Sequence, residues 1–241
     1  MRTADCRNRR RYPLLISFSG IDGSGKSTQI ERATEELDRN GYHVARFAFW
    51  DDVVVLSRFR EGVTHKVFKS EKGIGAPGKP VRRRDKNVRA WYLSLMRAAL
   101  YFLDALHLRL VVHRGRRFGA HAIIFDRYIY DEIANLPMAN TIARAYSHLL
   151  ASVAPRPHVA YVVDANPEAA CARKPEYPLD FTQRCREIYL QLAAMLGLTV
   201  VPASTVDGAH QFVMQKLSQQ VSLPSVASPG SSASERLQIP A

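Results

Sequence analysis

The residues in this sequence best suited to chemistry form one glycine-rich run near the N-terminus. The run is Gly20-Ile21-Asp22-Gly23-Ser24-Gly25-Lys26-Ser27-Thr28 and matches the pattern GxxxxGK[ST]. In this pattern the glycines let the backbone wrap around phosphate oxygens, a lysine bridges the β- and γ-phosphates, and a hydroxyl coordinates Mg²⁺. We therefore expect a nucleotide-binding loop in which Lys26 and Ser27 take these roles. The binding residues predicted from the pattern are Gly20, Asp22, Gly23, Ser24, Gly25, Lys26, Ser27 and Thr28.

A second group of reactive side chains follows the apolar run Ala122–Phe125. Asp126 ends this run and can hold Mg²⁺, usually through water, or orient an acceptor, while Arg127 can neutralise a transferring phosphate. The alternatives are a helix cap or solvated acid for Asp126 and a surface ion pair for Arg127. Beside a phosphate loop, the functional interpretation is favoured. Asp164 ends the run Val159–Val163, and starting the next helix is for it an equal alternative.

These side chains need a scaffold, and the sequence predicts one of alternating strands and helices. Such alternation with near-continuous apolar strands indicates an α/β fold with a parallel sheet buried on both faces. Ligands bind beyond the carboxyl ends of the strands in such folds, and all the residues above fall at those ends. Strands are expected at Leu14–Ser19, Val44–Phe49, Ala122–Phe125, Val159–Val163 and Thr199–Val201, and helices at 26–40, 89–113, 138–152, 180–196 and 207–220.

The longest helical pattern covers residues 89–113. Its apolar residues recur at spacings of three and four, at Leu93, Met96, Leu100, Leu103, Leu106 and Leu110. Four aromatic residues on or beside this helix could stack on a base, although a core position is favoured for them. They are Trp91, Tyr92, Tyr101 and Phe102. For Trp50, at the end of the second strand, the pocket and the core are equal alternatives.

Composition limits the class of protein. The chain has 241 residues, of which 46% are hydrophobic and 23% charged, so a substantial globular core is expected and a wholly disordered chain is excluded. The three cysteines lie far apart without CxxC spacing, which favours a reduced, cytoplasmic chain. No apolar run is long enough to cross a bilayer, and the arginine-rich N-terminus lacks the features of a signal peptide.

Most of the formal charge of +12 lies in two segments. Residues 1–12 carry five arginines and one aspartate, and residues 66–89 carry nine basic and two acidic residues. We expect a disordered basic arm at 1–12, a domain at 13–221 containing a basic loop at 69–87, and a disordered tail at 222–241. The basic segments suit polyphosphate, nucleic acid or acidic lipid, but solvated segments without a specific partner are favoured.

The order and spacing of four segments resemble the thymidylate kinase family of nucleoside monophosphate kinases. The segments are FSGIDGSGKSTQ (18–29), IIFDRY (123–128), YVVDANPEAACAR (161–173) and VPASTVDGAHQFV (201–213). The resemblance implies a three-layer P-loop kinase fold with a five-stranded parallel sheet, helices on both faces and a mobile lid near 166–180. It also implies Mg²⁺-dependent transfer of the ATP γ-phosphoryl group to a nucleotide 5′-phosphate, dTMP by default, and commonly a homodimer.

The resemblance also carries roles over to matching positions. Lys26 would hold phosphates, and Asp22 would lie near the acceptor sugar. Asp126 and Arg127 would lie between donor and acceptor, and Arg173 would be a lid arginine. Where the family often has a basic residue in the phosphate loop, this sequence has glycine at position 23, so Arg173 or the neighbouring lysine would have to serve.

The acceptor half departs from the family's pattern. The segment FWDDVVVLSRFREG has acids where an arginine usually grips the acceptor phosphate, which leaves Arg58 or Arg60 as substitutes. Ala105 stands where the family tends to have an arginine that reads the pyrimidine, and Asp131 replaces a small hydroxyl residue. Phosphoryl transfer from ATP is therefore a firmer prediction than dTMP as the acceptor.

Two alternatives to a nucleotide kinase stay open at this point. The first is a kinase of a nucleoside or another small hydroxyl compound, for which Asp126 is the available base. The second is a nucleotide-binding protein without catalysis, with the basic segments contacting a partner.

Overall fold

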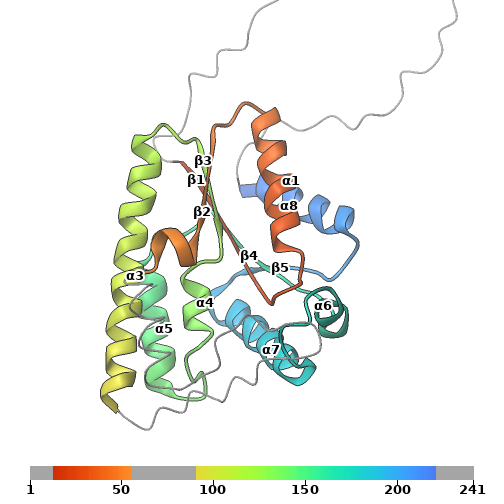
Figure 1. The fold of residues 1–241 in the computed structure, drawn as a ribbon. Coiled ribbons are helices and arrows are strands. Elements are labelled where there is room, and N and C mark those ends of the chain that lie inside the picture. Colours follow the sequence, from red (N-terminus) through yellow and green to blue (C-terminus); the bar gives the residue numbers. More distant parts are fainter. Residues whose placement is uncertain (1–12, 56–90, 221–241) are drawn as a thin grey trace, which may run out of the picture.

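The computed structural model describes residues 13–55 and 91–220, which form one layered unit (Figure 1). Five strands make a single parallel sheet in the order β2-β3-β1-β4-β5. The expected five-stranded parallel sheet is thus confirmed. The predicted arm 1–12, loop 69–87 and tail 222–241 lie outside the described residues, as do Arg58 and Arg60. The strands are β1 (Leu14–Ser19), β2 (Val44–Ala48), β3 (Ala122–Asp126), β4 (Val159–Val163) and β5 (Thr199–Val201).

The helices that were expected from periodicity are present with small shifts at their ends. Two short elements, η1 and α4, were not predicted, because a single turn carries too little periodicity to be recognised. The helix that was an alternative for the residues after Asp164 is present as α6. None of the helices in the described part of the chain has the length and apolar character that a membrane crossing requires. The helical elements are α1 (Lys26–Arg39), η1 (Phe49–Val53), α3 (Trp91–Arg117), α4 (Ile129–Ile133), α5 (Thr141–Val153), α6 (Pro167–Arg173), α7 (Leu179–Leu196) and α8 (Val206–Gln220).

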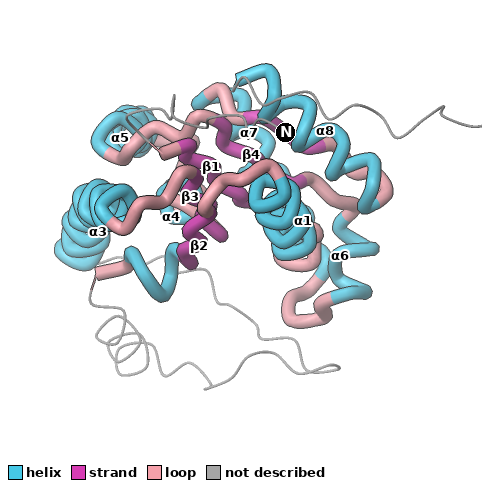
Figure 2. The backbone as a smooth tube through the Cα atoms, turned by 90° about the horizontal axis from the view of Figure 1, so that it is seen from above, coloured by secondary structure: helices cyan, strands magenta, loops and turns pink. Residues whose placement is uncertain are grey.

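The central strand β1 supplies apolar side chains to two separate cores, one on each face of the sheet. Leu14, Ile16 and Phe18 pack with residues of α1 and α8. Leu15, which points to the opposite face, packs with residues of α3, α4 and α5. Figure 2 shows these two groups of helices on opposite sides of the strands. Burial on both faces explains why β1 begins with the consecutive apolar residues Leu14, Leu15 and Ile16.

The leucine-rich stripe that the periodicity of α3 predicts faces outward, away from the core. The inner face consists of Tyr101, Ala105 and Leu108, which are buried against the core, with Phe102 partly buried beside them. The core position that was favoured for Tyr101 and Phe102 is therefore observed, while the side chains of Trp91 and Tyr92 lie outside the described residues. The outward stripe consists of Leu95, Met96, Leu103, Leu106 and Leu110, each at least 40% exposed.

The predicted site residues lie together at the carboxyl ends of the strands. Asp126 at the end of β3 lies level with Phe18 of β1 and Ala48 of β2. After β1 the chain passes to α1 on one face, and after β3 it passes to α4 and α5 on the other. A crevice for ligands forms where neighbouring parallel strands part in this way.

Candidate functional site

The glycine-rich loop lies between β1 and α1 and packs closely against two neighbouring segments. Gly20 has φ +140, and a Cβ atom built there would lie 2.6 Å from the carbonyl oxygen of Val163. Gly23 has φ +77, and its Cβ would lie 2.5 Å from the carbonyl oxygen of Ala170 in α6. These two positions therefore require glycine for space as well as for backbone conformation.

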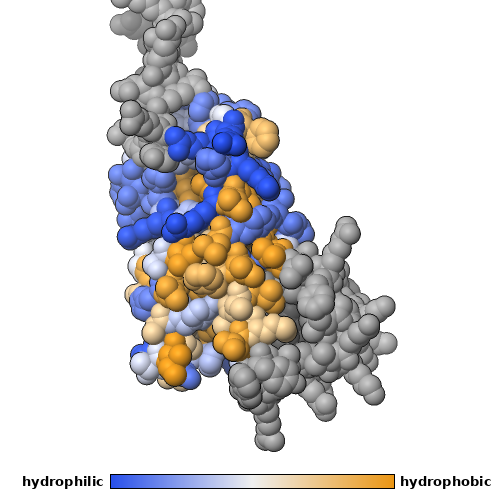
Figure 3. Space-filling view, turned by 90° about the vertical axis from the view of Figure 1, so that its left-hand side faces the viewer, coloured by the Kyte–Doolittle hydropathy of each residue, from blue (hydrophilic) through white to orange (hydrophobic). Residues whose placement is uncertain are grey.

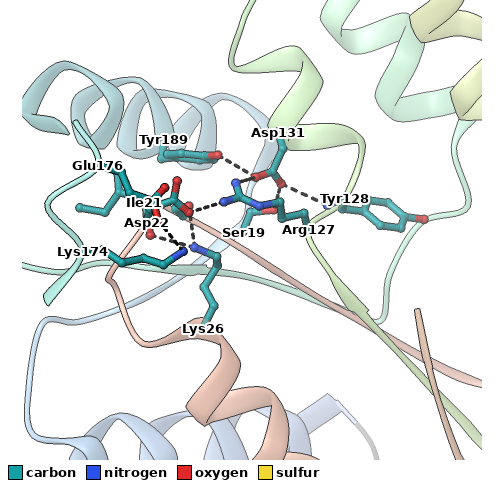
Figure 4. A network of polar contacts seen from close by, with 11 residues as sticks. Ser19, Ile21, Asp22, Lys26, Arg127, Tyr128, Asp131, Lys174, Glu176 and Tyr189 are labelled. Carbon is teal, nitrogen blue, oxygen red and sulfur yellow. Dashed lines mark hydrogen bonds and ion pairs between the residues drawn. The ribbon is translucent and has the colours of Figure 1, made fainter. Parts of the chain in front are cut away.

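Lys26, the first residue of α1, points back into this loop (Figure 4). Its Nζ donates to the carbonyl oxygens of Gly20 at 3.0 Å and Ile21 at 2.8 Å, and the residue is only 7% exposed. Burial and the nearby Arg127 cation lower the pKa of Lys26 from 10.5 to about 8, against the opposing carboxylates nearby. The ammonium is thus held under the loop with a proton that it loses readily.

Arg127 joins the end of β3 to the phosphate loop. Its Nη2 donates to the Asp22 carboxylate and its Nη1 donates to Asp131 Oδ1 at 2.9 Å. Burial opposes the charge of Arg127, but the carboxylates of Asp131 and Asp22 outweigh it, so the pKa of Arg127 is raised and the guanidinium stays charged. The predicted neighbours Lys26, Asp22 and Arg127 are therefore brought together in one polar network.

Asp131 is the centre of this network. It is 3% exposed and accepts hydrogen bonds from Ser19 Oγ at 2.6 Å, Tyr189 Oη at 2.7 Å and the Tyr128 backbone N–H at 3.1 Å, besides the one from Arg127. Burial, and then the Asp131 charge, raise the pKa of Tyr189 well above its usual value, which keeps that hydroxyl a donor. The sequence showed only that an acid replaces a small hydroxyl residue here.

The predicted Mg²⁺ ligands Ser27 and Asp126 lie at the start of α1 and at the end of β3. Ser27 is exposed on the first turn of α1, next to exposed Thr28, and the partly buried Asp126 carboxylate lies close enough to act on the charge of Lys26. In the described part of the chain, no three His, Cys, Asp or Glu side chains gather as a metal site. Their hydroxyl and carboxylate oxygens are of the kind that Mg²⁺ prefers, and their role as its ligands stays a prediction.

A cavity of about 290 Å³ opens beside the phosphate loop. One wall is the loop itself, from Gly20 to Asp22, and another is Arg127 with Asp131. Trp50 of η1, 41% exposed, lines the cavity, so the pocket alternative holds for this residue. The remaining wall comes largely from α7 and the turn before it, through Tyr177, Phe181, Thr182, Cys185, Ile188 and Tyr189.

The sequence did not predict that α7 lines one side of the cavity. Phe181, Cys185, Ile188 and Tyr189 are spaced as one face of a helix, so the expected helix 180–196 contained the signal. That face is largely apolar, however, and apolar faces of helices usually indicate packing in a core. Only the tertiary arrangement shows that this face borders a cavity.

The two candidate lid cations are placed differently. Arg173, the last residue of α6, is exposed and does not line the cavity, whereas Lys174 does. Lys174 Nζ lies 3.5 Å from Glu176 Oε1 (Figure 4). The role predicted for Arg173 remains a prediction. Of the two cations, Lys174 lies closer to the cavity. The range 166–180 consists of α6 and the turn into α7.

The segment Asp164-Ala-Asn-Pro leads directly into α6, as the alternative expected, but Asp164 itself is not the helix cap. Its carboxylate accepts two hydrogen bonds from Arg186 of α7, at 2.6 and 2.7 Å. The N-cap of α6 is instead Asn166, whose side chain accepts from the Glu168 N–H. The pair between Asp164 and Arg186 fixes α7 to the end of β4, next to the phosphate loop.

A parallel sheet in the order β2-β3-β1-β4-β5, with a GxxxxGK[ST] loop between β1 and α1, defines the P-loop kinase class of α/β folds. Comparisons with known proteins narrow this class. No family model matches the chain. It is 29% identical over 199 residues to the "Probable thymidylate kinase" of Pyrobaculum aerophilum, over 79% of this chain and 88% of the relative.

Two further comparisons agree. The chain is 26% identical over 219 residues to the "Probable thymidylate kinase" of Archaeoglobus fulgidus, over 87% of this chain and 97% of the relative. The crystal structure of thymidylate kinase from Ehrlichia chaffeensis has the same fold, with a TM-score of 0.54 at 17% identity over 86% of this chain and 98% of that one. These matches support the resemblance found in the motifs: the chain is thymidylate kinase-like over most of its length.

Proposed function

We propose that this chain is a phosphotransferase that moves the γ-phosphoryl group of ATP to a nucleoside monophosphate, with dTMP as the acceptor. The observation that carries the proposal is the cavity beside the phosphate loop, whose walls include Asp22 and Arg127. An acceptor phosphate in this cavity would lie next to the terminal phosphate of a nucleotide on the loop. The relatives named thymidylate kinase support dTMP as that acceptor.

The donor side consists of the loop and the start of α1. Backbone N–H groups of the loop and the positive end of the helix dipole attract the triphosphate. Lys26 then exchanges its two carbonyl partners in the loop for the β- and γ-phosphate oxygens. Ser27 and Asp126 would hold Mg²⁺, which supplies positive charge to the phosphates.

The acceptor side differs from the expected pattern. Ala105 is fully buried, and the neighbouring Asp104 accepts a hydrogen bond from the Val55 N–H, so neither faces the cavity. The residues that do face it are Trp50, whose indole can stack on a base, and Asn135, whose amide can pair with a base edge. These two side chains are the best candidates for reading the acceptor base.

Transfer needs positioning and charge more than proton removal. An oxygen of the acceptor phosphate forms a bond to the γ-phosphorus as the bond from that phosphorus to the β,γ-bridging oxygen breaks, which releases ADP. The acceptor phosphate is already an anion, so no base is required. Lys26 and Arg127 stabilise the charge on the oxygens of the transferring group. Arg127 has five N–H groups, and the two bonds to Asp22 and Asp131 leave others that can donate to phosphate.

The test is transfer from ATP labelled at the γ-phosphate to a panel of acceptors that includes dTMP, other nucleoside monophosphates and nucleosides. The proposal expects labelled thymidine diphosphate as the main product. Label only in a nucleoside monophosphate would support a nucleoside kinase, and tight ATP binding without transfer would support a binding protein. Lys26→Ala should lower kcat at least about 100-fold. Lys216→Ala, a surface lysine on α8, is the matched control and should keep full activity.

A further inference from the structure

The carboxylate of Asp131 is fully committed to partners within the protein. Its Oδ1 accepts from Arg127 and Tyr189, and its Oδ2 accepts from Ser19 and the Tyr128 N–H. A carboxylate oxygen has two lone pairs, so each oxygen is satisfied. Because a buried charge without partners is very costly, these four donors fix the position of the carboxylate.

The four donors come from three different parts of the fold. Ser19 ends β1, Tyr189 lies in the middle of α7, and the other two belong to the turn between β3 and α4. Figure 4 shows them converging on one carboxylate. Asp131 therefore ties the strand that leads into the phosphate loop to the helix that lines the cavity.

The conformation of Arg127 depends on the contacts that Asp131 makes. Its backbone has φ +67, the left-handed region that non-glycine residues avoid, and no other non-glycine residue among the described ones has a positive φ. Such a conformation persists only where surrounding contacts hold it. Its guanidinium is held at both ends, by Asp131 on one side and by Asp22 of the phosphate loop on the other.

We propose that Asp131 is a positioning residue for phosphoryl transfer: it holds the guanidinium of Arg127 at the point where the phosphate loop meets the cavity. The inference rests on the proposed function, since it assigns Asp131 a part in that reaction. Asp131 acts through Arg127, because its own oxygens are occupied by Arg127, Tyr189, Ser19 and Tyr128.

Asparagine cannot replace Asp131 in this role. An amide has only one acceptor oxygen, and its NH₂ group must face either the Arg127 side or the Tyr128 side. Hydroxyls can turn to accept from the amide, but the guanidinium and the backbone N–H cannot. Asp131→Asn thus leaves one fixed donor facing another donor, although side-chain size hardly changes.

The experiment is a double-mutant cycle on the full chain, with Asp131→Asn, Arg127→Ala and the two combined. Because a displacement of about 1 Å at a reacting group can cost 100-fold, Asp131→Asn should lower kcat by about 100-fold. The KM for ATP should stay within about threefold, since the loop still binds the donor. If Asp131 acts through Arg127, the double variant should be no slower than Arg127→Ala alone.

A matched pair of tyrosine variants keeps the test independent of whether Asp131→Asn folds. Tyr189→Phe removes one bond to Asp131, and Tyr161→Phe removes a bond of equal length, 2.7 Å, from a buried tyrosine to the Val213 carbonyl in α8. Tyr189→Phe should lower kcat severalfold, but only when Arg127 is present. Tyr161→Phe should leave kcat within about twofold. Thermal unfolding confirms that each variant is folded.

The outcomes separate the two proposals. A wild-type chain without transfer to any acceptor overturns the proposed function and this inference with it. An active wild type in which the losses of Asp131→Asn or Tyr189→Phe multiply with that of Arg127→Ala overturns the positioning role alone. An Asp131→Asn chain with normal kcat does the same. Losses that vanish in the Arg127→Ala background support the role.

Discussion

At the scale of single residues, Lys26 links phosphate binding to pH. Its pKa of about 8 means that the unliganded loop holds a partly neutral lysine at that pH, whereas a bound triphosphate favours the ammonium form. Binding of metal-free ATP should therefore take up about 0.8 proton at pH 8.5 and weaken as pH rises above 8. Titration calorimetry in two buffers of different ionisation enthalpy measures this uptake.

The control for this prediction is Lys26→Arg, which stays charged over the whole range and should show no uptake. A binding enthalpy of the wild type that does not depend on the buffer at pH 8.5 would contradict the prediction. The same pKa has a consequence for the unliganded protein. Between about 8 and 10.5 the unfolded chain carries the extra proton on this lysine, so its contribution to the free energy of unfolding rises with pH across that window and is smallest below it.

Trp50 gives a second prediction at this scale. Because base stacking on an aromatic side chain contributes about 1–3 kcal/mol, Trp50→Ala should raise the KM for dTMP by about 5- to 150-fold and leave the KM for ATP unchanged. Steady-state kinetics with each substrate varied in turn measures both constants. Phe118→Ala, an exposed aromatic at the far end of α3, is the control and should change neither. An unaltered KM for dTMP in Trp50→Ala would remove Trp50 from the acceptor site.

At the scale of elements, the close approach of α6 to the phosphate loop explains why position 23 is glycine. A basic side chain at position 23 would start 2.5 Å from the Ala170 carbonyl oxygen, so α6 would have to move. That a cation of the segment 166–180 takes the place of this basic residue stays a prediction, and of Arg173 and Lys174 only Lys174 lines the cavity.

Gly23→Ala tests this contact against a matched glycine. Gly41 has the same φ of +77 but nothing within 4 Å of a built Cβ, so Gly41→Ala adds only the backbone cost of about 1–2 kcal/mol. Gly23→Ala adds a backbone clash as well and should lower the free energy of unfolding by about 1–3 kcal/mol more. Urea unfolding of both variants measures the difference. Equal losses of unfolding free energy in the two variants would show that α6 can move aside without destabilising the protein.

The elements also show what could be predicted from sequence. The strands were found because buried parallel strands are continuous apolar runs, and the loop because its glycine pattern is local. Asp131 could not be assigned a role in this way, since Ser19 and Tyr189 lie 112 and 58 residues from it along the chain. The position of Trp50 depends on the short element η1, whose single turn has no periodicity to detect.

At the scale of the whole molecule, the outward stripe of α3 and the exposed residues Ile142 and Leu149 of α5 place apolar side chains on one face (Figure 3). Large exposed apolar patches commonly mark interaction sites, and the homodimer expected from the resemblance stays a prediction for this face. Sedimentation equilibrium of the wild-type chain should give twice the mass of one chain. The double variant Leu103→Glu, Leu106→Glu should give the mass of a single chain. A wild-type chain that stays monomeric at high concentration would contradict it.

The central claim is that the loop beginning at Gly20 binds the triphosphate of ATP and that the cavity beside Arg127 binds the nucleotide that receives its γ-phosphoryl group. A crystal structure of the chain with Mg²⁺, a non-hydrolysable ATP analogue and dTMP tests this most directly. The account predicts the β- and γ-phosphates within the loop and the dTMP phosphate between Arg127 and the γ-phosphate. A nucleotide bound away from the loop, or dTMP outside this cavity, would contradict it.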